Sequence, residues 1–350
     1  MAKRVTLKDI AGLTGVTSAS VSMILNGKEL SRFTPELIAR VRAAARALDY
    51  TTPSALSGQR QIAIISPSVN NPYHTTIIMG IERAALSCGF LTATYNTYWD
   101  PETERTILRR LERKSVAGII YVMNPLQPEL VRALDRRIPI VAVGDAVEGL
   151  EIDTVDINNY NAGRLVAEHL IALGHRDVAY ITTALNERHI PRIRRYEGLA
   201  ETFRERCPAG SVTVFSRDAK EEEELRGENV ELACGRELAR SCAREKKITA
   251  IVAINDMVAY GVLDGLTELG FRVPEDYSLC GFDNVFPSAF RRMWLTTVDN
   301  STVYHGGHAF RLLKEKIDHA GDGAAVHPVI RAEYKSELLV RGSTGAPRQR

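Results

Sequence analysis

The sequence predicts an α/β protein in which a three-helix head precedes a two-lobed core of doubly wound parallel sheets. The first part of the 350-residue chain contains short helical patterns around a glycine turn. From Ile62 onward, apolar β-rich runs alternate with amphipathic helical patterns, which is typical of parallel sheets covered by helices on both faces. This second part is too long for one ordinary hydrophobic core, so we expect two lobes with a cleft between them.

The first two predicted helices meet at a glycine. Thr6 and Asp9 form a capping-box pattern at the start of the first helix, and Gly15 supplies the turn that follows it. The second helix begins after a Thr17 cap. It ends near Asn26, a residue type that tolerates the left-handed conformation of a helix end.

A third predicted helix braces this pair. Thr34 is its expected cap, and Pro35 stands at its first helical position, where the missing N–H costs nothing. Its apolar side chains recur at helical spacing: Leu37, Ile38, Val41, Ala45 and Leu48. Two short helices joined at a glycine turn and braced by a third form a helix-turn-helix.

Composition shifts give the expected domain boundaries. The head covers residues 1–50, and residues 51–61 form a short linker rich in Pro, Ser and Gly. The core covers residues 62–350. Its two lobes are expected to consist of residues 62–157 with 287–325, and of residues 158–286 with 326–340.

Positive charge is concentrated at the front of the chain. The formal net charge is only +2, but residues 1–60 contain nine Lys or Arg against four Asp or Glu. A basic head on a slightly acidic body indicates a polyanionic partner for the head alone.

Several classes of protein are disfavoured by the composition. No run of eighteen apolar residues occurs and the start of the chain lacks the apolar segment of a signal peptide, so we expect a cytoplasmic protein without membrane contact. The five cysteines lack the paired spacing of zinc ligands, so we expect reduced thiols and predict neither a metal nor a cofactor.

Head and core together resemble the LacI/GalR family of bacterial transcriptional repressors. The matching strings include "TLKDIAGLTGVTSASVSMILNG" in the head, and "NPYHTTIIMGIERAALSCGF", "NAGRLVAEHLIALGHRDVAYI" and "AIVAINDMVAYGVLDGLTELGFRVPEDYSLCGFDN" in the core. Their joint order and spacing cover almost the whole chain. The resemblance implies a periplasmic-binding-protein-like core, a homodimer that grips double-stranded operator DNA, and a small-molecule effector bound between the lobes.

The second head helix is the candidate recognition helix. Its small, uncharged side chains permit close approach to a major groove: Ser18, Ala19, Ser20, Ser22 and Met23, after the Thr17 cap. The alternative is that this small, uncharged face packs on a neighbouring helix. The resemblance places Ser18, Ala19 and Met23 where family members carry base-contacting side chains. We assign Thr6, Ser22 and Asn26 to phosphate contacts.

Two departures from the family pattern affect DNA recognition. Met23 stands where Arg is common, and a thioether cannot donate the paired hydrogen bonds that identify guanine, so we hypothesise contact with a thymine methyl group. The linker is shorter than the family norm, and Leu56 is its one plausible minor-groove wedge, with Gly58 following almost at once. Either a single helical turn of the linker inserts Leu56 into the minor groove, or the linker is a flexible connection between head and core.

Effector contacts are sought after the β-runs, because ligands of doubly wound sheets bind beyond the carboxyl ends of strands. The candidates are Tyr73, His74, Asn124, Asp145, His189, Arg195, Asn255 and Asp283. The resemblance assigns contacts to Tyr73 or His74 and to Asp145, Arg195, Asn255 and Asp283. Each could instead cap a helix or serve a turn. That reading is strongest for Asp256 and Asn284, which are not among the candidates.

The arginine-rich segment 186–195 has two readings. Most arginine runs are solvated faces, which is the favoured interpretation here. The sharper hypothesis is that Arg195, with His189 or Arg192 beside it, recognises an anionic effector such as a sugar phosphate or a sugar acid rather than a neutral sugar.

Two other classes of function compete. An enzyme is disfavoured because no phosphate-binding glycine loop, HExxH motif or nucleophile elbow is present. A transport-type solute-binding protein would share the two-lobed core, but it would have no use for a basic three-helix head. We therefore expect a regulator in which effector binding shifts the lobe arrangement and with it the spacing of two heads on DNA. The tail shows no heptad pattern, so a coiled-coil tetramer is not expected.

Overall fold

The computed structural model divides the chain into two compact units, residues 1–60 and residues 61–350. It describes residues 5–25, 32–48, 61–114, 116–145, 149–185, 190–218, 229–319 and 328–349. The predicted linker, apart from residue 61, lies outside the described residues, together with the candidate wedge Leu56.

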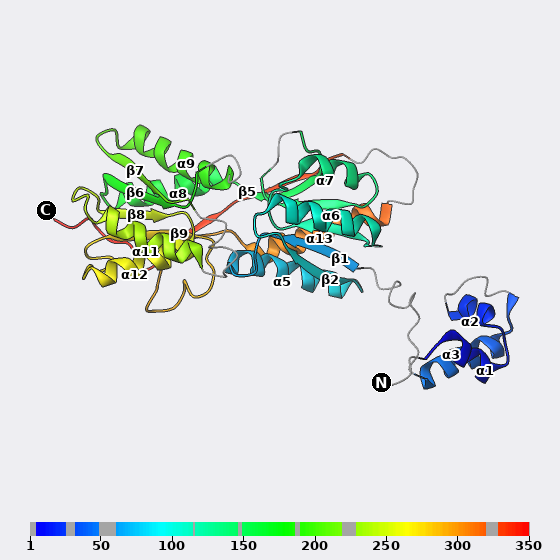
Figure 1. The fold of residues 1–350 in the computed structure, drawn as a ribbon. Helices are drawn as coiled ribbons and strands as arrows, with labels where there is room; N and C mark the ends of the chain where they lie inside the picture. The colour runs from blue at the N-terminus through cyan, green and yellow to red at the C-terminus, as the bar shows by residue number, and fades with distance from the viewer. Residues whose placement is uncertain are drawn as a thin grey trace. The chain divides into compact units, whose positions relative to one another are not determined.

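The head contains the three predicted helices: α1 (Leu7–Thr14), α2 (Ser18–Leu25) and α3 (Pro35–Ala47) (Figure 1). The Asp9 carboxylate accepts the backbone N–H of Thr6 at 2.7 Å, and Gly15 adopts the left-handed conformation with φ 68°. The Thr17 hydroxyl accepts the N–H of Ser20 at 3.1 Å, which caps α2 as predicted.

A small apolar core fixes the angle between α1 and α2. Ile10, Val21, Ile24 and Val41 are fully buried against one another. The Arg40 guanidinium of α3 also donates to the last turn of α1, at the carbonyl of Thr14. The third helix therefore braces the other two, as the sequence predicts.

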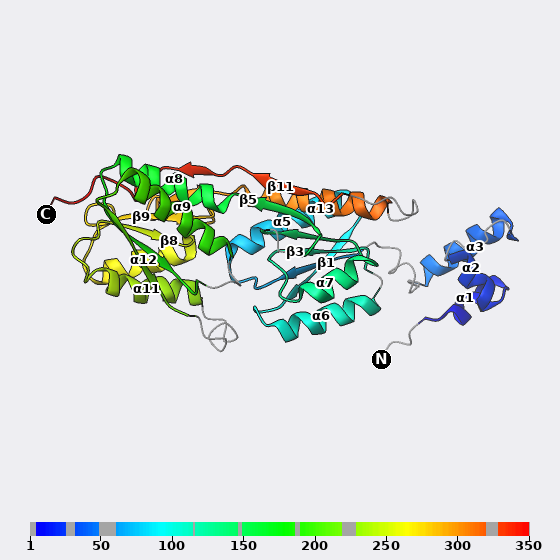
Figure 2. The same cartoon turned by 90° about the horizontal axis from the view of Figure 1, so that it is seen from above.

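The first lobe of the core is a six-stranded parallel sheet in the order β11-β5-β4-β3-β1-β2. Helices α5 and α13 cover one face and α6 and α7 the other (Figure 2). The elements are β1 (Gln61–Ser66), α5 (Pro72–Ser87), β2 (Leu91–Asn96), α6 (Pro101–Arg113), β3 (Gly118–Tyr121), α7 (Pro128–Asp135), β4 (Ile140–Val143), β5 (Asp153–Ile157), α13 (Thr302–His319) and β11 (Arg331–Tyr334).

The second lobe repeats this architecture. Its sheet has the order β12-β10-β9-β8-β6-β7 and is parallel except for β12. Helices α8 and α9 cover one face, and α11 and α12 the other (Figure 2). The elements are α8 (Asn159–Ala172), β6 (Asp177–Thr182), α9 (Ile190–Arg206), β7 (Ser211–Ser216), α11 (Val230–Cys242), β8 (Ala250–Ala253), α12 (Asp256–Glu268), β9 (Ser278–Phe282), β10 (Thr296–Asp299) and β12 (Glu337–Leu339).

The predicted lobe boundaries are wrong at two strands. Residues 287–325 were expected in the first lobe, but β10 pairs with β9 in the second sheet. Residues 326–340 were expected in the second lobe, but β11 pairs with β5 in the first. Both strands are four residues long, and their composition does not reveal the neighbour with which they pair. The chain therefore crosses between the lobes after β5, after β10 and after β11.

The inner strands of both sheets are largely buried, and the edge strands β2, β7, β11 and β12 are partly exposed. Buried inner strands beside amphipathic helices are the pattern that the alternating sequence predicts. Strands β3, β4 and β8 are buried along their whole length. In the described part of the chain, no helix combines the length and the apolar character that a bilayer crossing requires.

Helices α8 and α9 approach closely through two glycines. A Cβ atom added at Gly163 would overlap the carbonyl oxygen of Arg195, and one added at Gly198 would overlap that of Tyr160. This close approach matters because α9 carries Arg192 and Arg195 towards the space between the lobes.

We predict that Gly198→Ala lowers the free energy of unfolding by about 1–3 kcal/mol, because the helices must move apart. Urea unfolding followed by circular dichroism measures the loss. The matched control is Gly307→Ala in α13, where the nearest atom, the Arg311 guanidinium, lies 3.6 Å from the added carbon. That change should be neutral or slightly stabilising. Equal stability of the Gly198→Ala variant and the wild type would contradict the close packing.

Candidate functional sites

Helix α2 presents a small, uncharged surface. Ala19 is exposed, and Ser18, Ser20, Ser22 and Met23 are partly exposed. The packing side of the helix is supplied by its buried residues Val21 and Ile24, so the alternative in which the bland face covers a neighbour is not needed to bury the helix. Thr6 and Thr17 are exposed at the starts of α1 and α2, and the candidate Asn26 lies outside the described residues.

A cavity of about 650 Å³ lies between residues of the two lobes. Six of the predicted effector residues line it: Tyr73, His74, Asn124, Arg195, Asn255 and Asp283. They come together because the carboxyl ends of parallel strands and the helix N-termini that follow them meet at one edge of each sheet. Of the other two candidates, Asp145 is not among the lining residues, and His189 lies outside the described part of the chain.

Arg195 is buried, and its hydrogen-bonding groups are used within the second lobe. Its Nε donates to Asn159 Oδ1 at 2.9 Å, and its two terminal nitrogens donate to the Ile254 carbonyl at 2.7 Å and to Asp283 Oδ1 at 3.3 Å. The guanidinium also lies 4.8 Å from the centre of the Phe282 ring. Burial raises the pKa of the Asp283 carboxyl, and the Arg195 charge opposes that rise. Arg195 and Asp283 thus form an internal ion pair at the cavity wall.

Glu231 is a cavity residue that the sequence analysis missed. It lies in the first turn of α11, where one carboxylate oxygen accepts from Asn255 Nδ2 at 2.8 Å and the other from Asn71 Nδ2 at 2.6 Å. Arg192 approaches the same carboxylate at 3.8 Å. Burial raises the pKa of Glu231, and Arg192 opposes the rise. In the sequence this residue follows a run of acidic residues that reads as a solvated loop, and only its place two positions after the Asn229 cap marks it.

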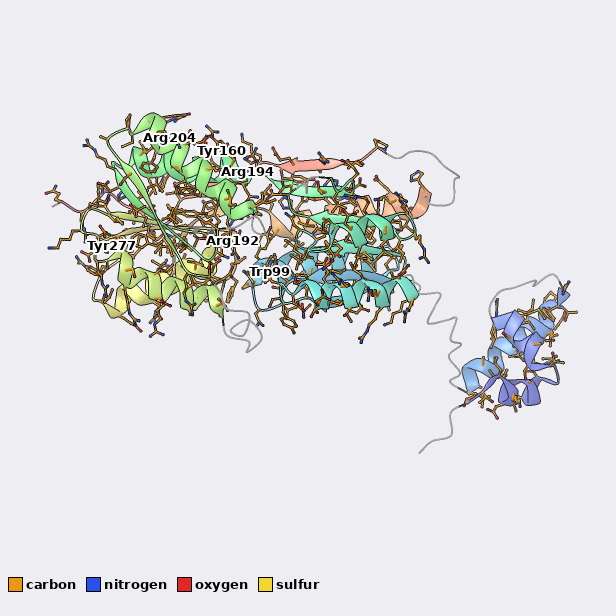
Figure 3. The ribbon with its side chains drawn as sticks, turned by 45° about the horizontal axis from the view of Figure 1, so that its top comes forward. Trp99, Tyr160, Arg192, Arg194, Arg204 and Tyr277 are labelled. Atoms are coloured by element: carbon orange, nitrogen blue, oxygen red, sulfur yellow. The ribbon has the colours of Figure 1, made fainter. Side chains whose placement is uncertain are left out.

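The three arginines in the first two turns of α9, Arg192, Arg194 and Arg195, differ in environment. Arg194 points outward and pairs with Glu197 at 3.0 Å, as expected for a solvated face. Arg192 contacts both Thr183 and Glu231, and Figure 3 shows it near Trp99 at the junction of the lobes. The favoured interpretation of a solvated face is therefore wrong for Arg192 and Arg195. Both arginines face carboxylates of the protein itself.

Aromatic side chains form part of the first lobe's wall. Tyr98 and Trp99 both line the cavity and adopt left-handed backbone conformations, with φ 54° and 60°. Such strain in bulky residues is concentrated at functional sites. Trp99 meets the His74 ring edge-on at 6.4 Å between centres. Burial lowers the pKa of His74 to about 4, so this ring is neutral near pH 7.

Comparisons with known proteins agree with this division. Residues 6–53 match the family described as bacterial regulatory proteins, lacI family, and residues 167–344 match a periplasmic binding protein-like domain. The HTH-type transcriptional repressor PurR of Haemophilus influenzae is 29% identical over 348 residues, with 97% of this chain and 98% of that protein covered. This chain belongs to the LacI family.

Solved structures have the same fold as this LacI-family chain. The lac repressor dimer bound to operator and the anti-inducer ONPF superposes with a TM-score of 0.75 at 22% identity, covering 98% of this chain and 100% of that one. A LacI family regulator from Enterococcus faecium with bound ribose gives a TM-score of 0.69 at 22% identity, covering 82% and 99%.

Asp145 in this LacI-family protein lies beside a crossing between the lobes. It accepts a hydrogen bond from Asn159 Nδ2 at 3.3 Å. Burial, together with the neighbouring Asp145 carboxylate, raises the pKa of Asp156 to about 9. The structure therefore places Asp145 beside Asp156, near the crossing that follows β5, and not among the residues that line the cavity.

We predict that Arg195→Ala lowers the free energy of unfolding by about 3–5 kcal/mol, because it leaves the buried Asp283 carboxylate without its cation. The neighbouring Arg194→Ala variant is the matched control. Its exposed pair with Glu197 should contribute less than about 1 kcal/mol. Chemical denaturation of both variants at pH 7 provides the comparison. Equal losses would mean that the buried pair carries no special stability.

Proposed function

We propose that this chain is a sequence-specific transcriptional repressor that binds operator DNA as a homodimer in the cytoplasm and responds to a small effector between its lobes. The observation that carries the proposal is the presence, in one chain, of a capped three-helix head with a small uncharged reading helix and of a polar cavity between two lobes. A solute-binding protein has use for the cavity only. An enzyme would need a reactive group, whereas the cavity carboxylates of Glu231 and Asp283 are engaged by arginines.

The proposed division of labour on DNA follows from side-chain size and charge. Ser18, Ala19 and Met23 contact base edges, because short or apolar side chains allow α2 to lie deep in a major groove. Thr6 and Ser22, at exposed or partly exposed positions, contact phosphates and fix the register. Asn26 and Leu56 retain their predicted roles as a phosphate contact and a minor-groove wedge.

Binding to a random operator library tests the DNA function and the role of Met23 together. We expect a salt-sensitive, sequence-selective complex without a guanine preference at the Met23 step. Met23→Arg should introduce such a preference, worth about 1–3 kcal/mol between guanine and the other bases. Deletion of residues 1–60 is the control, because it removes the head and leaves the compact core. Selective binding that survives this deletion would contradict the assignment.

The effector proposed is a neutral, hydroxyl-rich molecule of the sugar class. The two arginines of the described residues that line the cavity are each opposed by a protein carboxylate, Arg192 by Glu231 and Arg195 by Asp283, so neither offers an uncompensated positive charge to an anion. Tyr98 and Trp99 supply an apolar surface for a sugar ring. Asn124 and His74 each carry a buried polar atom with no hydrogen-bond partner among the described residues, which a bound hydroxyl would satisfy.

The E. faecium relative with bound ribose is consistent with this chemistry. The hypothesis of a sugar phosphate or sugar acid is the competing one. Since the hydrogen bonds of the Arg195 guanidinium go to groups of its own lobe, we favour the neutral class.

Thermal-shift screening of the full chain decides between these effector classes. A neutral sugar at 100 times its Kd should stabilise the native state by about 2.7 kcal/mol and raise Tm by several degrees. The phosphorylated and acid forms of the same sugar should have no effect, because they would meet paired carboxylates. Stabilisation by the anionic forms alone would overturn this choice of effector. Arg194→Ala serves as the control and should show the same shifts as the wild type, since Arg194 is exposed, pairs with Glu197 and is not among the lining residues.

Dimerisation requires an exposed surface that a second copy can cover. After β9, Phe286 and Phe290 are 72% and 54% exposed, with their rings 4.8 Å apart in an edge-on pair. Trp294, at 45% exposure, extends this aromatic surface. Exposed aromatic clusters of this kind mark protein contact sites. We assign this surface to the homodimer.

Sedimentation analysis of the Phe286→Asp/Phe290→Asp variant tests the assignment. We expect a monomer, and operator affinity reduced by about 10²–10⁴-fold, because one head alone loses the effective concentration supplied by its partner. Val340→Asp is the matched control, since Val340 is similarly exposed, at 60%, and follows a strand of the same lobe. A variant that remains dimeric would place the interface elsewhere.

A further inference from the structure

Three helix N-termini converge on the Glu231 carboxylate. Glu231 itself stands two positions after Asn229, the cap of α11. Asn71 caps α5, with its Oδ1 accepting the Tyr73 N–H at 2.9 Å. Asn255 caps α12, with its Oδ1 accepting the Val258 N–H at 3.0 Å. The positive ends of these helices stabilise a negative charge placed between them.

The two asparagines beside Glu231, Asn71 and Asn255, each cap a helix and also bind the Glu231 carboxylate. The Oδ1 atoms of Asn71 and Asn255 are occupied by helix capping, and this fixes their Nδ2 groups in the direction of Glu231. Each Nδ2 then donates to a different oxygen of the same carboxylate, at 2.6 Å and 2.8 Å. Because helix capping already fixes the orientation of both amides, little further side-chain freedom is lost when they bind the carboxylate.

One of these two bonds joins the lobes. Asn71 belongs to the first lobe, whereas Glu231 and Asn255 belong to the second. Protein clefts commonly use helix N-termini to bind an acceptor group of a ligand. Here a side chain of the protein already takes that place, within the wall of the cavity.

We propose that Glu231 is an internal latch, which holds the two lobes together across the cavity through Asn71 in the absence of any effector. The latch rests on the proposed function only in treating this cavity as the effector site. It implies that the effector binds to lobes whose closure is already favoured, and that the Asn71–Glu231 bond sets the effector-free population of the closed form.

The proposal can be tested by exchanging the donor and the acceptor of the Asn71–Glu231 hydrogen bond. Asn71→Asp keeps an oxygen for capping α5, but it places a carboxylate against Glu231 and should open the lobes. Glu231→Gln alone keeps a single acceptor oxygen for the two donors, Asn71 Nδ2 and Asn255 Nδ2, so one of them meets the new NH₂ group and loses its bond. In the Asn71→Asp/Glu231→Gln double variant, the amide introduced on α11 still accepts from Asn255 through its oxygen. Its nitrogen donates to the carboxylate introduced at the α5 cap, so the bond is restored in the opposite sense.

A matched control lies on the same helix. Glu237→Gln makes the same chemical change on the exposed side of α11, where Glu237 pairs with Arg217 at 3.0 Å. Because this carboxylate does not face the first lobe's Asn71 cap, its replacement should leave the contact between the lobes intact.

The readout is hydrogen–deuterium exchange of the full chain without effector or DNA, in segments 68–78 and 229–238. Loss of one charge-assisted hydrogen bond should accelerate exchange there by on the order of tenfold in Asn71→Asp and in Glu231→Gln. The double variant should return close to the wild-type rate, and Glu237→Gln should match the wild type. In a Trp294→Phe background, acrylamide quenching of Trp99 fluorescence should rise in the two single variants. It should return to the wild-type level in the double variant.

Three outcomes would overturn the latch. Wild-type exchange in Asn71→Asp would mean that the bond does not hold the lobes. If the exchange rate of the double variant stayed high, the effect would come from the carboxylate introduced by Asn71→Asp and not from loss of the bond. A uniform increase over both lobes, with a lowered Tm, would indicate general destabilisation. Because neither DNA nor effector is present, loss of operator binding in the separate library experiment would disprove the proposed function and leave this result standing.

Discussion

The burial of a charged arginine at the carboxyl ends of the second sheet is the constraint on which the site depends. Arg195 is only 6% exposed, so its guanidinium depends on acceptors within the protein. Each of its three nitrogens donates one hydrogen bond: to Asn159 Oδ1, to the Ile254 carbonyl and to the Asp283 carboxylate. These three acceptors come from the start of α8, the end of β8 and the end of β9. One side chain thereby fixes the relative positions of a helix start and two strand ends, which form the wall of the cavity.

The electrostatic character of the cavity follows from the same requirement. Low polarisability around the site forces every buried charge to find an opposite charge or several donors. Arg192 and Arg195 satisfy two carboxylates, and His74 is held neutral by burial. The described lining of the cavity also contains amides and aromatic faces. In the function proposed here, these groups distinguish ligands by the arrangement of their hydroxyl groups.

The sequence predicts the elements well, because their signals are local. The caps Thr17 and Thr34 stand where a hydroxyl can accept an N–H, and the structure confirms both. At Thr6, the backbone N–H and the hydroxyl donate to the Asp9 carboxylate. Strand-end residues such as Asn124, Asn255 and Asp283 could be expected at the cavity, since topology brings strand ends together. The partners of β10 and β11 could not be predicted, because sheet pairing of short strands depends on distant chain crossings. Glu231 was missed because nothing in the local sequence distinguishes it from the run of acidic residues before it.

The chain crosses between the lobes three times, after β5, after β10 and after β11, and this has a consequence for how such a protein can be divided. Neither lobe is a continuous stretch of sequence, so no single truncation isolates one of them. A nick in any one crossing leaves two covalent connections in place. Three covalent connections also leave the lobes less freedom of relative movement than a single linker would.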